Sequence, residues 1–573
     1  MFEKISIHTP RQFVPSNINI GNWTTLEPLF KQLEEQIKTA SSAEKLELFI
    51  LNWEELSAAV SEEGSKRYIA MTCQTEDKDA EKAYLDFVEK IEPEEKKCNF
   101  LLAKKLIQHP NLKELKNQRY EVFIRDTALQ VELFRSENVS LETKTAKLGQ
   151  QYQKTIGGLT VQFEGKEQTL IQMSRHLEEP ERKHRQKAWE LVANRRLEEA
   201  EKIDVYLNDL AKIRNQMSEN AGFPNYRDFA HQRLGRFDYS PDDCISFQEA
   251  IEEEMVPLLR ELQDERLQAL GINELKPWDT ATDPKGRPPL KPFEKVSDLV
   301  ARSQAIFNQV DGNLADWFQT MQDLGLLDLA NRKGKAPGGY QCSLDESRLP
   351  FIFMNSVGVQ RDVETLLHEA GHAFHAMASQ NEPLHSYRHA PIEFCEVASM
   401  AMELLGSEFL EEFYNEEEAR RARIAHLEGI VFVFPWIATV DAFQHWLYLN
   451  PNHSIEERDK AWSNLIDRFG GNVDWTNYES AKAKLWHKQL HIFLHPFYYI
   501  EYGIAQLGAL QVWANSKNNS SKALADYKAA LALGGSRPLP KLFEHCNIRF
   551  DLSRNTVAPM ADLLRKELNT LKN

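Results

Sequence analysis

Hydrophobic residues recur every three or four positions along the first part of the chain, with charged residues between them. Residues 42–60 and 79–97 keep this spacing over several turns, as expected for one apolar face of an α-helix. The charged positions between them are typical of solvated surface. We therefore expect a helical lobe over residues 1–200 and a separate, larger region over residues 201–573.

A few segments depart from the helical pattern. Residues 160–170 alternate apolar and polar positions around Gly165, which predicts a small hairpin or an extended excursion. The segment PFIFMN, residues 350–355, predicts a short apolar strand bounded by turn residues. Residues 275–296 are rich in proline and predict a long loop, and Pro241 can begin a helix. The expected fold class is mainly α, with a small β element.

Composition limits the possible partners. At 573 residues the chain is expected to fold around more than one core. A hydrophobic share of 42%, a charged share of 27% and a mean hydropathy of -0.51 are ordinary for a globular protein. Its formal net charge of -17 repels phosphate backbones and anionic lipids. We therefore expect neither a nucleic acid nor a membrane as partner, and the sequence does not indicate an oligomeric state.

The six cysteines are scattered and form no CxxC pair, which favours reduced thiols. The first residues, MFEKISIHTPRQFVP, lack the continuous apolar stretch of a secretory signal, and nowhere do 18 apolar residues follow one another. The expected location is the cytoplasm.

The segment VETLLHEAGHAFHAM, residues 363–377, contains the spacing His368-Glu369-x-x-His372. Two histidines four positions apart project from the same side of a helix, roughly 6 Å apart along its axis, and can hold one cation. Glu369 lies about 100° around the helix, which suits a base acting on water better than a metal ligand. The surrounding residues are apolar, and a buried His-Glu-His cluster without a metal would be costly.

Catalytic zinc needs three protein ligands and an open position. His375 is seven residues from His368, roughly 10 Å along a straight helix, so we interpret it as a supporting or core histidine. In a second predicted helix, residues 390–405, the side chains of Glu393, Glu396 and Glu403 share a face. Glu396 is the predicted third ligand and Glu403 its support, whereas Glu393 is interpreted as a carboxylate at the surface or at the helix start.

Histidines and tyrosines are concentrated in residues 485–513, which we expect to be helical after Pro496. A peptide carbonyl that becomes an oxyanion needs a hydrogen-bond donor beside it, and a phenol or an imidazole can supply one. Tyr499 and Tyr502 are three residues apart and face the same way on a helix. His487 is interpreted as a surface residue. Gly338 and Gly339 either permit a close approach of substrate backbone or form a plain turn.

The chain resembles the oligoendopeptidase F branch of the thimet oligopeptidase and neurolysin family of zinc peptidases. The residues that carry the resemblance lie within 332–509: RKGKAPGGY, PFIFMN, HEAGHAFH, EFCEVASMAMELL and HIFLHPFYYIEYGIAQLG. Weaker likeness extends over most of the chain. The resemblance implies a mainly α, prolate fold in which two lobes enclose a deep channel that admits only oligopeptides. It makes residues 201–573 a zinc metallopeptidase catalytic region.

The resemblance also implies roles for single residues. One zinc ion per chain would be held by His368, His372 and Glu396, with Glu369 as the base. Tyr502 would donate to the oxyanion, and His491 and Tyr499 would hold the substrate backbone. Tyr498 and Gly339 are further candidates for substrate contact, and core packing is the alternative for Tyr498.

One departure from the family concerns specificity. The glycine-rich loop that follows the late histidine in thimet oligopeptidase and neurolysin is replaced here by the shorter IFLHPF. The side-chain preference of those enzymes therefore does not carry over. Two other interpretations stay open: a metallocarboxypeptidase, which would use the same metal site, and an inactive peptide-binding protein.

Overall fold

A computed structural model describes residues 2, 4–115 and 118–573 of the chain. The described residues form two compact units, each assembled from three segments. Unit 1 comprises residues 1–132, 290–423 and 508–550, and unit 2 comprises residues 133–289, 424–507 and 551–573. The fold is mainly α, as predicted from the sequence. The domain boundary expected between residues 200 and 201 falls inside unit 2. The division into a lobe over residues 1–200 and a catalytic region over residues 201–573 stays a prediction.

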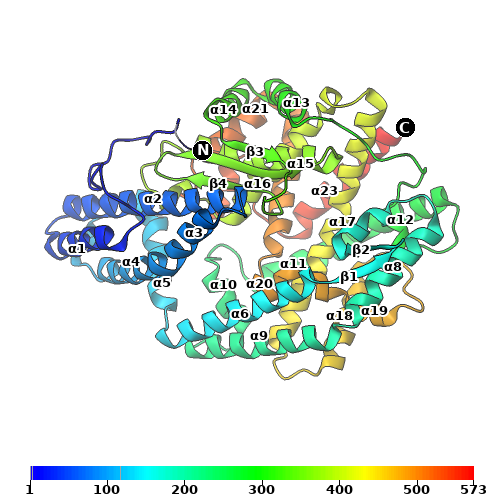
Figure 1. The fold of residues 1–573 in the computed structure, drawn as a ribbon, viewed down its shortest axis with the longest axis horizontal. Helices are drawn as coiled ribbons and strands as arrows, with labels where there is room; N and C mark the ends of the chain where they lie inside the picture. Colours follow the sequence, from blue (N-terminus) through cyan, green and yellow to red (C-terminus); the bar gives the residue numbers. More distant parts are fainter. Residues whose placement is uncertain (1, 3, 116–117) are drawn as a thin grey trace. The chain divides into compact units, whose positions relative to one another are not determined.

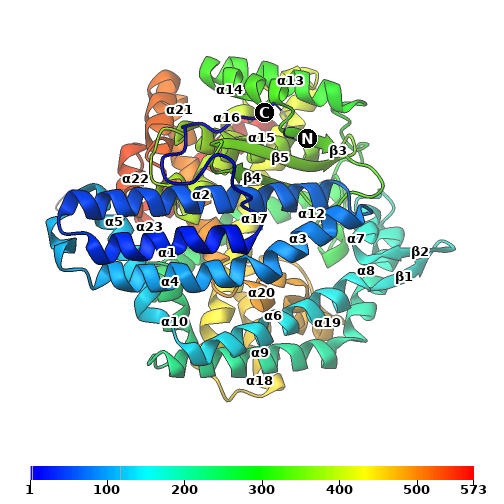
Figure 2. The same ribbon diagram turned by 60° about the vertical axis from the view of Figure 1, so that its left-hand side comes forward.

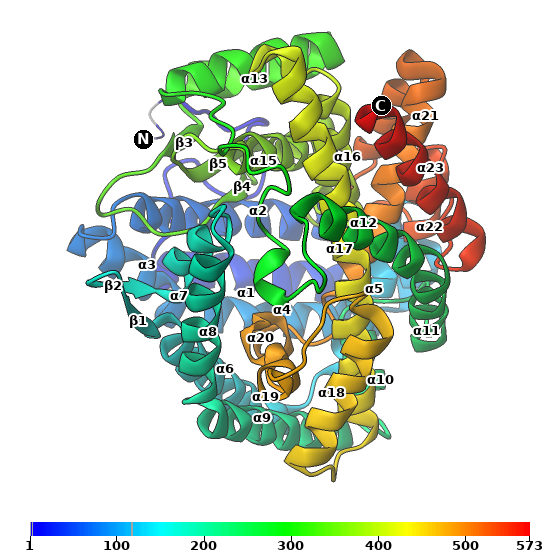
Figure 3. The same cartoon turned by 90° about the vertical axis from the view of Figure 1, so that its right-hand side faces the viewer.

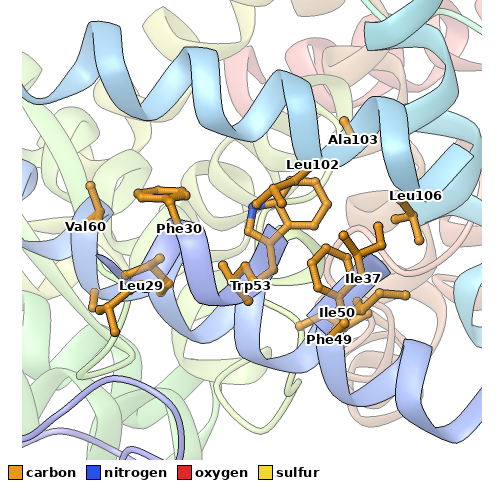
Figure 4. Close-up of a cluster of buried hydrophobic side chains, with 14 of the residues drawn as sticks. Leu29, Phe30, Ile37, Phe49, Ile50, Trp53, Val60, Leu102, Ala103 and Leu106 are labelled. Atoms are coloured by element: carbon orange, nitrogen blue, oxygen red, sulfur yellow. The ribbon is translucent and has the colours of Figure 1, made fainter. Parts of the chain in front are cut away.

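Unit 1 begins with a group of helices (Figure 2), and their apolar side chains form one core. Leu29, Phe49 and Leu102 are buried in that core, and Figure 4 shows all three packed between the helices. The helices and 3-10 turns are α1 (Trp23–Thr39), α2 (Ala43–Cys73), α3 (Lys78–Lys90), α4 (Glu92–Ile107), η1 (Pro110–Glu114), η2 (Gln118–Tyr120) and α5 (Glu121–Leu133).

The helix predicted around residues 79–97 is two helices in the structure. α3 ends at Lys90 and α4 begins at Glu92, with Pro93 in its first turn. Proline is tolerated there because the first backbone N–H groups of a helix have no intrahelical partner, but it interrupts the hydrogen bonds of a continuing helix. The single continuous helix was therefore a wrong prediction, although both halves are helical.

A three-stranded sheet in unit 1 has the order β3-β5-β4. β5 (Leu349–Ser356) contains the predicted strand PFIFMN and pairs in parallel with β3 (Leu327–Ala330) and antiparallel with β4 (Tyr340–Leu344). PFIFMN offers no free backbone edge to an extended peptide, because β5 has a partner strand on each side. β4, by contrast, is an edge strand of the sheet.

Helices α15 and α16 of unit 1 follow this sheet in the chain, and α15 packs on its face (Figure 1). Both agree with the helices predicted over residues 363–377 and 390–405. The helices and 3-10 turns of this part are α13 (Val296–Val310), α14 (Gly312–Leu324), α15 (Gln360–Ala378), η6 (Ser386–Arg388), α16 (Ile392–Ser407), η7 (Leu410–Glu412) and α22 (Leu539–His545).

Unit 2 has its own core and contains the predicted hairpin, β1 (Thr160–Phe163) and β2 (Lys166–Thr169), turned at Glu164 and Gly165 in the left-handed region. Helices α6 and α9 run side by side (Figure 3). The proline-rich loop and the helix start at Pro241 are also as predicted.

The other elements of unit 2 are α6 (Ser136–Gly157), α7 (Leu170–Met173), η3 (Ser174–Leu177), α8 (Arg182–Leu197), α9 (Ala200–Asn220), α10 (Tyr226–Arg233), α11 (Pro241–Ala250), the π-helical turn η4 (Ile251–Met255), α12 (Val256–Leu270), η5 (Pro277–Asp279), α18 (Ile455–Phe469), α19 (Glu479–Ala483), η8 (Leu485–Lys488), α20 (Leu490–Leu494) and α23 (Arg554–Lys572).

Two long helices contribute residues to both units: α17 (Glu416–Leu449) and α21 (Ile500–Leu531). By length and composition α17 could cross a membrane, and it is the one described helix that passes this test. Of its most apolar 18-residue window, 56% is buried inside the protein, as in a core helix. A single such helix is weak evidence for a membrane span.

Candidate metal centre and catalytic residues

Helix α15 begins with an acidic cap. The Asp362 carboxylate accepts hydrogen bonds from the backbone N–H groups of Val357, Gly358 and Val359, at 2.8, 2.8 and 3.0 Å. A negative charge at a helix N-terminus is stabilised by the helix dipole and by otherwise unpaired N–H groups. The cap fixes the start of the helix that carries His368, Glu369 and His372.

Three predicted ligands converge between α15 and α16. His368 Nε2 lies 3.4 Å and His372 Nε2 lies 3.7 Å from Glu396 Oε2. The ligand atoms of the three residues all lie within 4.8 Å of one another. Two imidazoles and one carboxylate are the donors of many catalytic zinc sites. The residues present therefore fit one zinc ion.

Neighbouring groups orient these ligands. Glu403 Oε1 lies 2.6 Å from His368 Nδ1, which leaves Nε2 of that ring for a cation. The backbone of Cys395 accepts a hydrogen bond from the His372 ring. Ser399 Oγ donates to Glu396 Oε2 at 3.0 Å. The structure thus brings Glu403 to the supporting position expected from the sequence.

Burial and neighbouring charges shift the pKa values of the candidate ligands. Burial would lower the pKa of His368, but the hydrogen bond and charge of Glu403, together with other nearby carboxylates, raise it to about 9. Burial lowers the pKa of His372 well below its usual value, and the charge of His368 adds to this. Burial also raises the pKa of Glu396. A cation at the centre would replace the proton that His368 shares with the carboxylates.

Glu369 lies on α15 beside the ligands and under β4. Burial, opposed by the charge of His368, raises its pKa to about 7, and the backbone N–H of Gln341 in β4 donates to its carboxylate. A carboxylate with a pKa near neutrality is suited to accept and return a proton. The predicted base is therefore adjacent to the edge strand of the sheet.

Gly338 and Gly339 directly precede β4. Gly338 has a φ of 99°, which favours glycine, and its carbonyl accepts from Asn355 Nδ2 at 2.9 Å. A Cβ at Gly339 would lie 3.4 Å from the carbonyl oxygen of Phe353 and from Thr365 Cγ2. The pair therefore lets the chain enter β4 close to β5 and α15, and the choice between turn and substrate contact stays open.

Two other polar residues near the centre are buried. The ring of His375 lies 5.8 Å from that of Phe394, and burial lowers its pKa to about 4. It is a core histidine, one of the two interpretations made from the sequence. Glu393 lies in the first turn of α16 and is buried. The helix-start interpretation of Glu393 was correct, and the surface interpretation was wrong.

The candidate tyrosines, Tyr498, Tyr499 and Tyr502, belong to unit 2. α21 begins at Ile500, and the four residues before it form a turn in which Phe497 has a φ of 66°. The helix predicted after Pro496 is therefore present from Ile500, and Tyr499 lies in the turn before it rather than on the helix. Gln444 Oε1 accepts from the Phe497 backbone N–H at 2.8 Å, and Arg236 donates to the Phe497 carbonyl. These two buried side chains hold the turn, and nothing in the local sequence pattern indicated them.

His491 and the three tyrosines form one aromatic group. The His491 ring lies 4.8 Å from that of Tyr499, 5.9 Å from that of Tyr498 and 5.9 Å from that of Tyr502. Gln489 Nε2 donates to His491 Nδ1 at 2.7 Å, so the neutral ring carries its proton on Nε2. Burial lowers the pKa of His491 to about 4, which keeps it neutral. The group can present an N–H donor and phenol donors.

His487 is buried, contrary to the surface position expected for it. Its Nε2 lies 3.2 Å from Asp204 Oδ1, and Arg458 Nη2 donates to the same oxygen at 3.0 Å. Lys484 Nζ donates to the other oxygen of Asp204 at 2.7 Å. The buried carboxylate gathers these donors from separate helices, so sequence periodicity around His487 could not predict its burial.

Comparisons with known proteins identify the family of the chain. Residues 13–134 match the profile of the peptidase M3 N-terminal domain, and residues 175–561 match that of peptidase family M3. An oligoendopeptidase F homolog of Borreliella burgdorferi is 25% identical over 38% of this chain and 37% of its own length. The curated oligoendopeptidase F relatives are each aligned over 29% to 54% of their length.

Solved structures match over almost the whole chain. PZ peptidase A, solved with an inhibitor, has a TM-score of 0.88 at 28% identity and covers 98% of this chain and 99% of its own. A protein assigned as oligoendopeptidase F from Bacillus anthracis has a TM-score of 0.83 at 26% identity and covers 97% of each chain. Two profile matches that together span most of the sequence, with these structural matches, place the chain in peptidase family M3, in its oligoendopeptidase F branch.

Proposed function

We propose that this protein is a zinc-dependent endopeptidase that hydrolyses internal bonds of short peptides. The observation that carries the proposal is the convergence of His368, His372 and Glu396 with Glu369 beside them. A bound zinc ion would supply Lewis acidity to the substrate carbonyl and make water a stronger nucleophile at neutral pH. Membership of peptidase family M3 supports peptides as the substrate class.

Glu369 would act as the base and then as the acid. Its carboxylate would take a proton from the attacking water and deliver it to the nitrogen of the leaving amine, so that no proton is gained or lost overall. A pKa raised to about 7 suits both transfers. Glu403 would keep His368 in the tautomer that presents Nε2.

β4 would align the substrate. It is an edge strand of the sheet, and an extended peptide can add to such an edge through main-chain hydrogen bonds. This requirement for an extended chain would favour oligopeptides over folded proteins. Tyr502 would donate to the developing oxyanion, and His491, Tyr499 and Tyr498 would hold substrate; this part of the proposal rests on the family resemblance.

We also propose a cytoplasmic location. All six cysteines are free in the structure, and three of them, Cys73, Cys244 and Cys546, are buried. Free cysteines are typical of a reducing compartment.

The test compares Glu369→Gln with Glu364→Gln, an acidic residue on the same helix whose partner is Gln360. Glu369→Gln should retain zinc and lose at least about 100-fold in kcat, whereas Glu364→Gln should match the wild type. Cleavage of a quenched fluorescent peptide and zinc content by mass spectrometry give the two readouts. Undiminished cleavage by zinc-loaded Glu369→Gln would remove the base assignment.

Peptides with free and amidated C-termini separate the two peptidase interpretations. An endopeptidase should cut both, and products identified by mass should lie on each side of an internal bond. Loss of cleavage upon amidation would favour a metallocarboxypeptidase. Absence of stoichiometric zinc together with peptide binding would favour the inactive binding protein.

A further inference from the structure

A second group of metal-binding side chains lies in unit 1. Asp345 follows β4 directly, and His385 and His389 flank the short turn η6 that precedes α16. The ligand atoms of the three residues lie within 4.8 Å of one another, as in the candidate metal centre. Gln341, whose N–H reaches Glu369, is four residues before Asp345, about 13 Å along a strand, and the two groups share no residue. It is a separate site.

The two groups have closely similar geometry. The ring centroids of His368 and His372 are 4.9 Å apart with 85° between the planes, and those of His385 and His389 are 5.1 Å apart with 84°. Asp345 carboxylate oxygens lie 3.3 Å from His385 Nε2 and 2.8 Å from His389 Nε2. Each group has two histidines four residues apart that face a single carboxylate. The second group therefore already has the arrangement of a three-ligand metal site.

One ring nitrogen of the second group lacks a well-aligned hydrogen-bond partner among the described residues. His385 Nε2 is buried and makes no well-aligned hydrogen bond to any described residue, although Asp345 Oδ2 is within 3.3 Å. Ser61 Oγ donates to the same oxygen at 2.6 Å. A buried ring nitrogen without an aligned partner is unfavourable, and a cation between the ring and the carboxylate would remove that cost.

The histidine segment is fixed before any ion binds. Glu54 Oε2 accepts from the backbone N–H and from Oγ of Ser386, each at 2.7 Å. The Gly535 N–H donates to the Tyr387 carbonyl at 2.7 Å, and a Cβ at Gly535 would lie 2.4 Å from the carbonyl oxygen of His389. These contacts hold the backbone on both sides of the two rings. A bound ion would therefore need to spend little of its binding free energy on ordering this segment.

The local charges predict moderate affinity. Arg348 and Arg388 lie nearby, and burial, with the charge of Arg348, lowers the pKa of Arg388 to about 10. Asp345 and the buried Glu54 oppose these positive charges. His389 Nε2 lies 2.8 Å from Asp345 Oδ1, so a metal would have to displace the proton held in this contact.

Accessibility differs across the group. The side chain of Asp345 is 4% exposed, that of His385 is 17% exposed and that of His389 is 49% exposed. An ion could therefore enter from solvent and keep a position for water. Two imidazoles and one carboxylate favour a borderline cation such as Zn²⁺, Co²⁺ or Ni²⁺ over Mg²⁺ or Ca²⁺, which prefer oxygen ligands.

A third group, His231, Cys244 and His445 of unit 2, is also compact. Its His231 Nε2 accepts from the Arg236 guanidinium at 3.1 Å. Arginine is a permanent donor, so the neutral ring carries its proton on Nδ1 and has no lone pair left for a cation. This contact disfavours a metal there, and the second group has no comparable donor on either ring among the described residues.

We propose that Asp345, His385 and His389 form a second, solvent-accessible site for a divalent transition-metal ion. The ion would join the turn after β4 to the segment that leads into α16, the helix that carries Glu396. Its occupancy would therefore stabilise unit 1 next to the candidate metal centre without taking part in bond cleavage.

Metal stoichiometry of the full-length, tag-free protein tests the proposal. The protein is stripped of metal, dialysed against increasing Zn²⁺ and analysed by elemental mass spectrometry. Wild type should bind about two ions per chain in a tighter and a weaker step, and His389→Gln should lose the weaker step. His545→Gln, an exposed histidine of the same unit outside the described groups, is the matched control and should bind as wild type does.

A second variant keeps the test independent of the proposed function. Glu396→Gln should lose the tight step and retain the weaker one, and Co²⁺ absorption of that variant should disappear when His389→Gln is added. His385→Gln should act as His389→Gln does, and circular dichroism checks folding in each. Equal weak binding in wild type, His385→Gln and His389→Gln would overturn the second site. Unchanged tight binding in Glu396→Gln would contradict only the proposed catalytic ligand.

Discussion

Gly371 of α15 lies against the backbone of Ser399 in α16, and a Cβ at Gly371 would stand 2.5 Å from Ser399 Cα. Real Cβ atoms do not approach a backbone carbon so closely, so only glycine permits this helix contact. His372 is the next residue on α15, and Glu396 lies about one turn before Ser399 on α16. The distance between the helices, and hence between the ligands, depends on a residue that binds nothing.

Gly371→Ala should therefore separate the helices. Alanine favours a helix by about 1 kcal/mol over glycine, but the overlap should cost more, for a net loss of about 1–3 kcal/mol in unfolding free energy. Zinc affinity should fall as well. Gly429→Ala in α17, where a Cβ would meet nothing within 4 Å, is the control and should be neutral or stabilising. Equal stability and zinc binding in both variants would contradict the packing argument.

Glu403→Gln should weaken metal binding without abolishing it. The carboxylate 2.6 Å from His368 Nδ1 orients the ring and increases its basicity, and loss of such a partner lowers metal affinity about 10- to 100-fold. Competition with a chromophoric chelator measures the zinc dissociation constant. At saturating zinc the variant should regain most of its peptidase activity, and a permanent loss of kcat would instead indicate a direct role for Glu403 in the reaction.

The outer edge of β4 can be tested with proline. Gln341 N–H points to Glu369, so by the alternation of an antiparallel ladder Ser343 N–H also points away from β5. Ser343→Pro removes that outward donor and should raise KM for extended peptides about 10-fold with little change in folding. Cys342→Pro should unfold this region, because it removes a ladder bond to β5. An unchanged KM in Ser343→Pro would exclude substrate pairing at this position.

Tyr502→Phe should lower kcat by about 10² to 10³ while KM stays within a few-fold, because the phenol is assigned to an oxygen that becomes negative only in the transition state. Tyr499 is assigned to hold substrate backbone in the ground and transition states alike, so Tyr499→Phe should act more on KM. One fluorescent peptide serves both variants, with zinc content checked in each. A Tyr502→Phe enzyme with unchanged kcat would leave His491 as the candidate donor.

Asp204 predicts a loss of stability in acid. Burial alone would raise its pKa, but the hydrogen bonds of His487 and Lys484 outweigh burial and lower it to about 2. A carboxyl whose pKa is lower in the folded state contributes its stability above the unfolded pKa of about 3.9 and loses it as pH falls towards 2. The contribution is on the order of 2 kcal/mol.

Urea unfolding at several pH values measures this contribution. Wild type should lose stability steeply between about pH 4 and pH 2. Asp204→Asn should be less stable at pH 7, with a flatter pH dependence, because the titrating group is gone. Asp562→Asn on α23 is the control: Asp562 is exposed and should leave the profile unchanged. Parallel profiles in wild type and Asp204→Asn would assign the acid sensitivity to other carboxylates.

Elements whose cause is local could be predicted from the sequence. The spacing of His368, Glu369 and His372 sets a helix face, because side chains four apart on a helix must be neighbours. The same rule predicts Glu396, as a carboxylate on an otherwise apolar helix. The hairpin at Gly165 and the helix start at Pro241 likewise follow from the backbone preferences of glycine and proline.

Only the tertiary structure decided features that depend on partners distant in the chain. PFIFMN reads as a strand, but its central place between β3 and β4 is set by pairing with segments that no local pattern identifies. The turn before Ile500 is held by Arg236, and His487 is buried by Asp204. Asp345 meets His385 and His389 across 40 and 44 residues of sequence. Periodicity records which residues share a face of one element, whereas packing between elements determines what that face contacts.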